Sequence, residues 1–343
     1  MESQLWFVYA VVTTLSWGVW GAFIERPERN GFPATLGYAV WALTMVPCAA
    51  VALVVLGSLP EHDLRSVVLG SAAGLLGAAG QLVLFDALRR GPAYLVFPVV
   101  SLSPVVSVLL SVVLLGETAS PRAWAGIVLA LLAMPLLSFQ PRDPRARVEG
   151  RVWFLLALVV FLAWGIQAYV LRFANATMRS ESLFFYMTLT ALLLVPVAWR
   201  MTDFARPVNW GASGAGLAFP VQLLNSIGAL TMVYAFRHGK VIIVSPMINA
   251  LAPVITIVLS LLLYRVVPHR VVVAGMALAR RLPPDHLSEG SKDAIKAGAG
   301  MISLMAALVL GLLVSSAKSH FDSADEAMTE GGAKVILLDR VRR

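Results

Sequence analysis

The chain has 343 residues, of which 59% are apolar and 13% are charged, and its formal net charge is +8. A mean hydropathy of +0.80 excludes a soluble enzyme, because a water-soluble domain could not hide this many apolar side chains in its core. The basic residues are spread over short connections and form no basic helix, which excludes nucleic acid as a partner. The composition indicates a protein that lies in the lipid bilayer.

Nine stretches are long and apolar enough to cross a membrane, since about 20 helical residues span its hydrocarbon layer of about 30 Å. They cover residues 5–24, 33–57, 66–88, 93–115, 123–139, 152–171, 182–199, 210–236 and 241–264. Asp86 is the only charged side chain within them, and the arginines collect in the connections. The sequence therefore predicts a multi-pass, all-α integral membrane protein, which we expect in the bacterial inner membrane.

A two-fold repeat organises these stretches, with residues of the first half recurring at spacings of 147 to 149. The matched pairs include Trp6 and Trp153, Trp17 and Trp164, Arg89 and Arg237, Pro98 and Pro246, and Pro104 and Pro253. Each copy holds five stretches, so the second copy enters the membrane from the opposite side. We expect about ten transmembrane helices in two inverted five-helix repeats, at 1–139 and 151–279, joined by a polar linker at 140–150. Inverted repeats are typical of secondary transporters.

The stretches 93–115 and 241–264 each contain two prolines in their interior. These are Pro98, Pro104, Pro246 and Pro253. A proline removes a backbone donor and crowds the carbonyl four residues earlier, so it bends the helix and frees carbonyl groups. At membrane depth such groups need protein, water or solute as partners. The prolines either act as packing kinks or shape a binding site in both halves.

Indole and amide side chains share helix faces in the middle of several stretches. The set that we expect along a substrate pathway is Trp17, Gln81, Trp164, Gln167, Gln222, Asn225 and Asn249. Amides in lipid need partners, so these faces should point into the bundle. Each amide either joins two helices by a hydrogen bond or lines an aqueous pathway.

Asp86 is the one candidate within the stretches for a carboxylate that couples transport to an ion such as the proton, because an acid inside a membrane is expensive unless it has a function. Arg89 and Arg90 follow three and four residues later. A local ion pair on the same helix is therefore the alternative interpretation.

Enzyme motifs are not found in the sequence. The five histidines lack metal-ligand spacing, and neither a phosphate-binding glycine loop nor a nucleophile motif occurs. We therefore expect no catalysis, no cofactor and no metal site.

The fourth and ninth stretches, together with the segment FDALRR at 85–90 and the pair Gly116 and Glu117, resemble the drug/metabolite transporter superfamily, in particular its EamA-type members. The resemblance covers about residues 5–279. It implies a ten-helix transporter that moves amino acids, metabolites or drugs, often as an exporter. One departure is that Glu117 aligns with Val266, so the second copy lacks this acid.

The tenth helix of that architecture should begin near residue 269, but only nine apolar residues, 271–279, precede two arginines. At 1.5 Å per residue they reach about 14 Å and cannot cross. Residues 280–343 resemble a fragment of the bestrophin-like bacterial membrane protein family and contain one further hydrophobic span at 297–317. We expect the last helix to be truncated and replaced by this foreign segment.

Two hypotheses for the function follow. The first is a secondary transporter that exports small metabolites or amino-acid-like solutes by alternating access, with the bilayer, a small-molecule solute and a coupling proton as its partners. The alternative is a non-transporting membrane protein that arose from a gene fusion or truncation. The incomplete tenth helix is the feature on which the two hypotheses differ.

Overall fold

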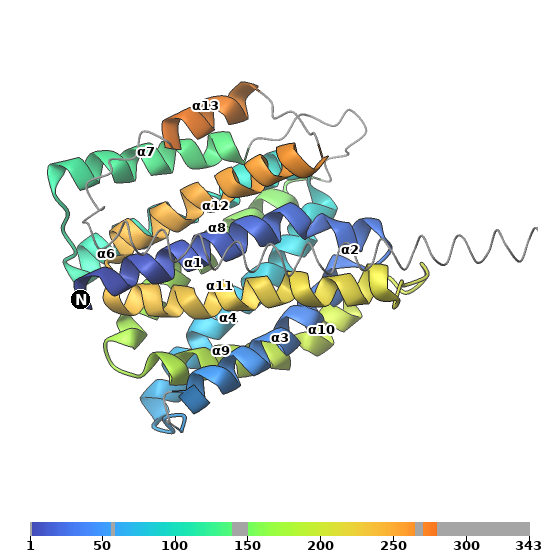
Figure 1. Ribbon diagram of the computed structural model, residues 1–343, viewed down its shortest axis with the longest axis horizontal. Helices are drawn as coiled ribbons and strands as arrows, with labels where there is room; N and C mark the ends of the chain where they lie inside the picture. Colours follow the sequence, from blue (N-terminus) through green and yellow to red (C-terminus); the bar gives the residue numbers. More distant parts are fainter. Residues whose placement is uncertain (1, 56–58, 139–149, 265–269, 280–343) are drawn as a thin grey trace, which may run out of the picture. The chain divides into compact units, whose positions relative to one another are not determined.

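The computed structural model describes residues 2–55, 59–138, 150–264 and 270–279, and every element in this part of the chain is a helix (Figure 1). The first half contains α1 (Glu2–Phe23), α2 (Glu25–Arg29), α3 (Ala34–Val55), α4 (Leu64–Arg90), α5 (Ala93–Val100), α6 (Ser103–Leu115) and α7 (Pro121–Leu137). The second half contains α8 (Val152–Asn175), α9 (Ser180–Leu193), α10 (Val195–Arg200), η1 (Ala212–Gly216), α11 (Leu217–His238), α12 (Val241–Tyr264) and α13 (Arg270–Ala279). The expected all-α membrane fold is confirmed.

Within the described residues, eight helical segments are long and apolar enough to cross a membrane. They match eight of the nine expected stretches. The remaining stretch, expected at 123–139, is the shorter apolar helix α7 of 17 residues. The expected foreign segment at 280–343, its span at 297–317 and nearly all of the linker lie outside the described residues.

Local sequence signals explain where several helices begin and end. α4 begins after Asp63, whose carboxylate accepts a hydrogen bond from the Ser66 amide at 3.0 Å. Hydrogen bonds from Ser66 also lower the pKa of this carboxyl. α6 ends at Gly116, whose φ of +63° favours glycine. Ser120 then caps α7, because its hydroxyl accepts from the Ala123 amide at 3.2 Å.

The two proline-containing stretches fold differently. In the first half the helix breaks at Ser101 and Leu102, between Pro98 in α5 and Pro104 in the first turn of α6. In the second half α12 continues unbroken through both of its prolines. The same proline spacing therefore gives a broken helix in one unit and a continuous helix in the other.

The helices of the two halves pack against each other in related pairs. α1 packs on α11 and α12, and its repeat counterpart α8 packs on α4, α5 and α6. α3 contacts α11, as α9 contacts α4. We call residues 1–139 the first unit and residues 151–279 the second unit. The two units are joined mainly by α1, which packs against helices of the second unit, and by α8, which packs against helices of the first.

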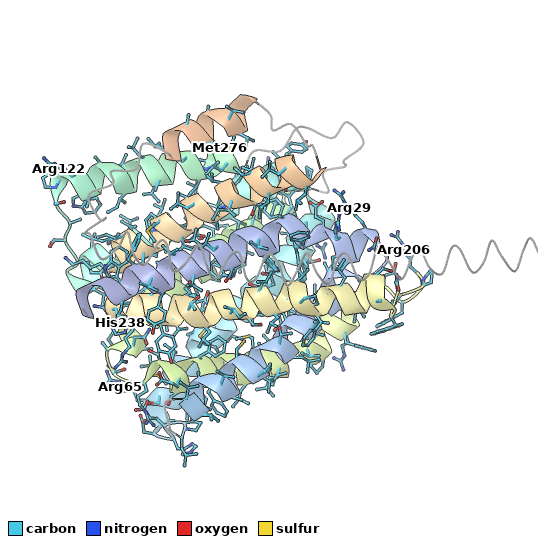
Figure 2. All side chains as sticks on the ribbon, viewed as in Figure 1. Arg29, Arg65, Arg122, Arg206, His238 and Met276 are labelled. Atoms are coloured by element: carbon cyan, nitrogen blue, oxygen red, sulfur yellow. The ribbon has the colours of Figure 1, made fainter. Side chains whose placement is uncertain are left out.

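The two units are inverted relative to each other. Figure 2 shows Arg65, near the start of α4, and His238, at the end of α11, at the same end of the bundle, which we call the proximal end. Arg29 and Arg206 lie at the other end, the distal end. α4 therefore begins at the end where α11 finishes, so the two helices run in opposite directions. Since α4 and α11 are repeat counterparts, the two units are inverted.

Candidate functional site

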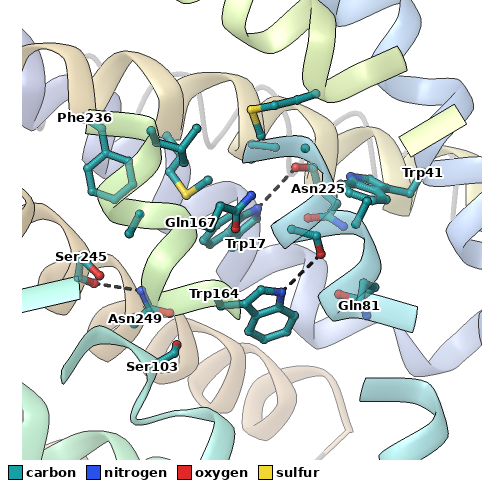
Figure 3. Close-up of a pocket in the computed structure, with 18 of the residues that line it drawn as sticks. Trp17, Trp41, Gln81, Ser103, Trp164, Gln167, Asn225, Phe236, Ser245 and Asn249 are labelled. Atoms are coloured by element: carbon teal, nitrogen blue, oxygen red, sulfur yellow. Dashed lines mark hydrogen bonds between the residues drawn. The ribbon is translucent and has the colours of Figure 1, made fainter. Parts of the chain in front are cut away.

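A cavity of about 270 Å³ lies between the two units, and both contribute side chains to it (Figure 3). It is bordered by helices α1, α3, α4, α6, α8, α9, α11 and α12. Its polar and aromatic lining consists of Trp17, Trp20, Trp41, Gln81, Ser103, Trp164, Gln167, Asn225, Phe236, Ser245 and Asn249. Methionine, alanine, glycine, leucine and Pro104 complete it.

The structure brings together most of the residues that the sequence placed along a pathway. Six of the seven line this cavity, namely Trp17, Gln81, Trp164, Gln167, Asn225 and Asn249. The seventh, Gln222, lies beside it, where its amide oxygen is 3.4 Å from the indole nitrogen of Trp20 and 3.4 Å from the amide nitrogen of Asn225. Of the four prolines only Pro104 lines the cavity.

Two equivalent indole hydrogen bonds join the units across the cavity. Trp17 Nε1 donates to the backbone oxygen of Asn225 at 3.4 Å, and Trp164 Nε1 donates to that of Gly77 at 3.3 Å. Trp17 and Trp164 are repeat counterparts, as are Gly77 and Asn225. The duplication therefore placed the same donor and acceptor on both sides of the cavity.

Glycine makes these indole contacts sterically feasible. A Cβ at Gly80 would lie 2.6 Å from Trp164 Nε1, and a Cβ at its counterpart Gly228 would lie 2.4 Å from Trp17 Nε1. Real Cβ atoms do not approach so closely, so a larger residue would displace the ring. The two glycines thus let each indole approach the facing helix.

Most of the lining amides already have protein partners. Gln167 donates to the backbone oxygen of Ala73 at 3.0 Å, which joins α8 to α4, and Asn249 donates to that of Ser245 at 2.9 Å. Both side chains therefore border the cavity and also bond to protein, Gln167 between two helices and Asn249 within α12. Gln81 differs, because its amide has no hydrogen bond within the described part of the chain.

The lining carries no formal charge, since none of the residues that border the cavity in the described structure is acidic, basic or a histidine. Asp86 is not among them, and its carboxylate lies 3.2 Å from Arg90 Nε on the same helix, in a partly exposed pair. This geometry supports the local ion pair. No group of three side chains that could hold a metal ion is found in the described residues.

A partly buried ion pair at the proximal end was not predicted from the sequence. Glu117 is only 8% exposed, and its carboxylate lies 3.6 Å from Arg172 Nε and accepts the Ile242 amide at 3.1 Å. Arg172 also donates to the backbone oxygens of Phe236 and Arg237 at 3.1 and 2.6 Å. Because Phe236 also lines the cavity, this network contacts one of the helices that border it. The sequence signal was Glu117 itself, but its partner lies 55 residues away in the chain.

Comparison with solved structures supports the fold. One protein of known crystal structure superposes with a TM-score of 0.63 and 19% sequence identity, and the match covers 80% of this chain and 99% of that one. At this identity the likeness concerns the fold alone.

Sequence comparisons identify the family. An uncharacterized protein of Methanocaldococcus jannaschii is 34% identical over 76 residues, which are 22% of this chain, and the chain matches 56% of that relative's length. The sequence profile of the EamA-like transporter family matches residues 4–139 and 151–279. The two matched segments are the two copies of the repeat, and together they make up most of the chain. The chain therefore belongs to the EamA-like transporter family, within the drug/metabolite transporter superfamily.

Proposed function

We propose that the protein is a secondary transporter that exports small metabolites or amino-acid-like solutes across the bacterial inner membrane by alternating access. The observation that carries this proposal is the cavity between two inverted units, lined by residues from the middle of helices in both. Secondary transporters bind their solutes near the midplane at the interface of such repeats, and rocking of one unit against the other exposes the site to either side.

The first unit (1–139) and the second unit (151–279), joined by the linker (140–150), would be the moving parts. Trp17, Gln81, Trp164, Gln167, Asn225 and Asn249 would contact the solute. Gln222 would position Asn225 by accepting a hydrogen bond from its amide, and Pro98, Pro104, Pro246 and Pro253 would shape the helices that carry the site. Asp86 would not carry a coupling proton, because it is engaged at a helix end away from the cavity.

One observation favours the alternative of a non-transporting protein. Helix α13 has 10 residues and packs mainly on α7. At 1.5 Å per residue it reaches about 15 Å, half the hydrocarbon thickness. A five-helix unit whose last described helix is so short would lack part of one wall among the described residues.

Proteoliposomes would test both functions. Uptake of labelled amino acids and small metabolites would be compared between this chain and a version rejoined after Ala279 to a complete apolar tenth helix, with protein-free liposomes as the control. We expect both proteins to accumulate at least one solute above the control. Uptake by the repaired version alone would support the fusion alternative, and uptake by neither would contradict the transporter proposal.

A further inference from the structure

The cavity combines four indole rings with a lining that has no formal charge. Trp17, Trp20, Trp41 and Trp164 come from three helices and both units. Their rings offer flat apolar surfaces on which a planar group can stack. An ionised group that enters such a site loses its hydration and finds no counter-charge, so an uncharged group is strongly preferred.

Gln81 is the lining amide whose hydrogen bonds are left for a solute. Gln167, Asn225 and Asn249 donate to other protein groups, whereas the side chain of Gln81 has no such bond within the described residues. An amide offers two donor hydrogens and one acceptor oxygen. The best partner is a neutral group that both donates and accepts, such as a carboxamide, a urea or a lactam.

The size of the cavity limits the solute further. A cavity of about 150 Å³ holds one benzene molecule, and this cavity, at about 270 Å³, is nearly twice that size. A single aromatic ring with a short amide substituent fills such a space.

We propose that the cavity selects an uncharged, planar solute with an amide-like group, and that Gln81 hydrogen bonds to that group while the indoles cover its flat part. This inference rests on the proposed function and narrows its solute class to uncharged metabolites, so zwitterionic amino-acid-like solutes are not expected to bind. It differs from a cation-binding aromatic cage, in which the ring faces attract a positive charge, because the lining offers no carboxylate to neutralise a desolvated cation.

A matched series of probes tests the inference on the purified full-length chain in detergent. Four of the nine tryptophans line the cavity, so quenching of tryptophan fluorescence reports binding. The probes are 2-phenylacetamide, phenylacetate and 2-phenylethylamine, which share a ring and chain and differ in charge. We expect 2-phenylacetamide to bind with a Kd lower by roughly tenfold or more than that of either ion.

Two variants assign the contact to Gln81. Gln81→Leu should weaken binding of 2-phenylacetamide roughly tenfold and leave binding of toluene unchanged, which shows that the cavity is intact. Gln81→Glu should transfer the preference to 2-phenylethylamine, because it adds the missing negative charge.

Three outcomes overturn the inference: equal or tighter binding of either ion by the natural chain, unchanged binding of 2-phenylacetamide in Gln81→Leu, or no binding of any probe, toluene included. These binding results are independent of transport. A chain that transports solutes but prefers a charged probe would retain the proposed function and lose this inference. A chain that binds the probes as expected but does not transport would retain this inference and lose the proposed function.

Discussion

At Gly77 the first unit presents no side chain to the cavity where the second unit presents Asn225, and at Gln81 it presents an amide where the second unit has Ala229. The backbone frame around these positions is nevertheless shared, as the two indole hydrogen bonds show. The indole hydrogen bonds that join the units thus stayed symmetric after duplication, whereas the side chains that face the cavity diverged. A nearly two-fold frame thus encloses an asymmetric site.

Charge distinguishes the two units even more. Arg172 in the second unit forms the partly buried pair with Glu117, whose own side chain is only 7% exposed. Its counterpart in the first unit is Glu25, and the side chains of the pair that Glu25 forms with Arg29 are 67% and 74% exposed. The ion pair at the proximal end therefore includes a buried carboxylate, whereas the ion pair at the equivalent position of the distal end is exposed to solvent.

The largest effect is expected from removing this charge asymmetry. Arg172→Gln should lower the free energy of unfolding by about 2 to 3 kcal/mol, because it leaves the buried Glu117 carboxylate without its counter-charge; the partial exposure of Arg172 keeps the loss below that of a fully buried pair. Glu25→Gln, at the equivalent position, should change it by less than about 1 kcal/mol, since exposed pairs contribute little. Reversible unfolding in mixed detergent micelles measures both, and equal effects would remove the distinction.

A smaller effect is expected at the glycines that let the units pack closely. A Cβ on Gly165 would lie 2.4 Å from Val106 Cβ and 2.7 Å from the Ser103 backbone oxygen. Gly165→Ala should therefore destabilise the protein by about 1 to 2 kcal/mol.

Two matched alanine variants complete that test with the same unfolding measurement. At the counterpart Gly18 the nearest backbone oxygen is 3.1 Å away, so Gly18→Ala should cost somewhat less. Gly216→Ala serves as the control, since nothing lies within 3.6 Å of a Cβ there. A larger loss of stability for Gly18→Ala than for Gly165→Ala would show that the distance from the added Cβ to the nearest backbone oxygen does not determine which variant is less stable.

Equal effects are expected where the frame is symmetric. Trp17→Phe and Trp164→Phe each remove one indole hydrogen bond to a backbone oxygen while retaining most of the ring. Each should lower the melting temperature in the same detergent, by an amount that corresponds to about 1 kcal/mol. A difference between the two variants larger than this value would show that the shared geometry does not carry equal energy.

The smallest effect is expected at Asp86, whose counterpart in the second unit is Tyr234. Its pair with Arg90 is partly exposed, so Asp86→Asn should change stability by less than about 1 kcal/mol. Uptake driven by a pH gradient in proteoliposomes should continue at the rate of the natural chain. Loss of gradient-driven uptake with retained solute exchange would instead make Asp86 the coupling acid.

Sequence reasoning predicted the all-α membrane fold because apolar length is a direct physical requirement for crossing lipid. It also placed Gln167 and Asn225 beside the cavity, since an amide is costly in lipid unless it points into the bundle. It missed Trp41 and Phe236, because an aromatic residue in an apolar stretch is indistinguishable from one that packs against lipid or core. It also missed the pair of Glu117 and Arg172, because hydropathy carries no information about which helices meet.

The short helix α7 has a consequence for the surrounding lipid. Its 17 residues extend about 26 Å, and Val128 and Leu132 on its surface are 50% and 56% exposed. Lipid chains that cover these side chains must shorten to match, so the bilayer should be thinner beside α7 than beside the 27-residue α4. A thicker bilayer would therefore increase the hydrophobic mismatch beside α7, and short-chain lipids should gather around this helix.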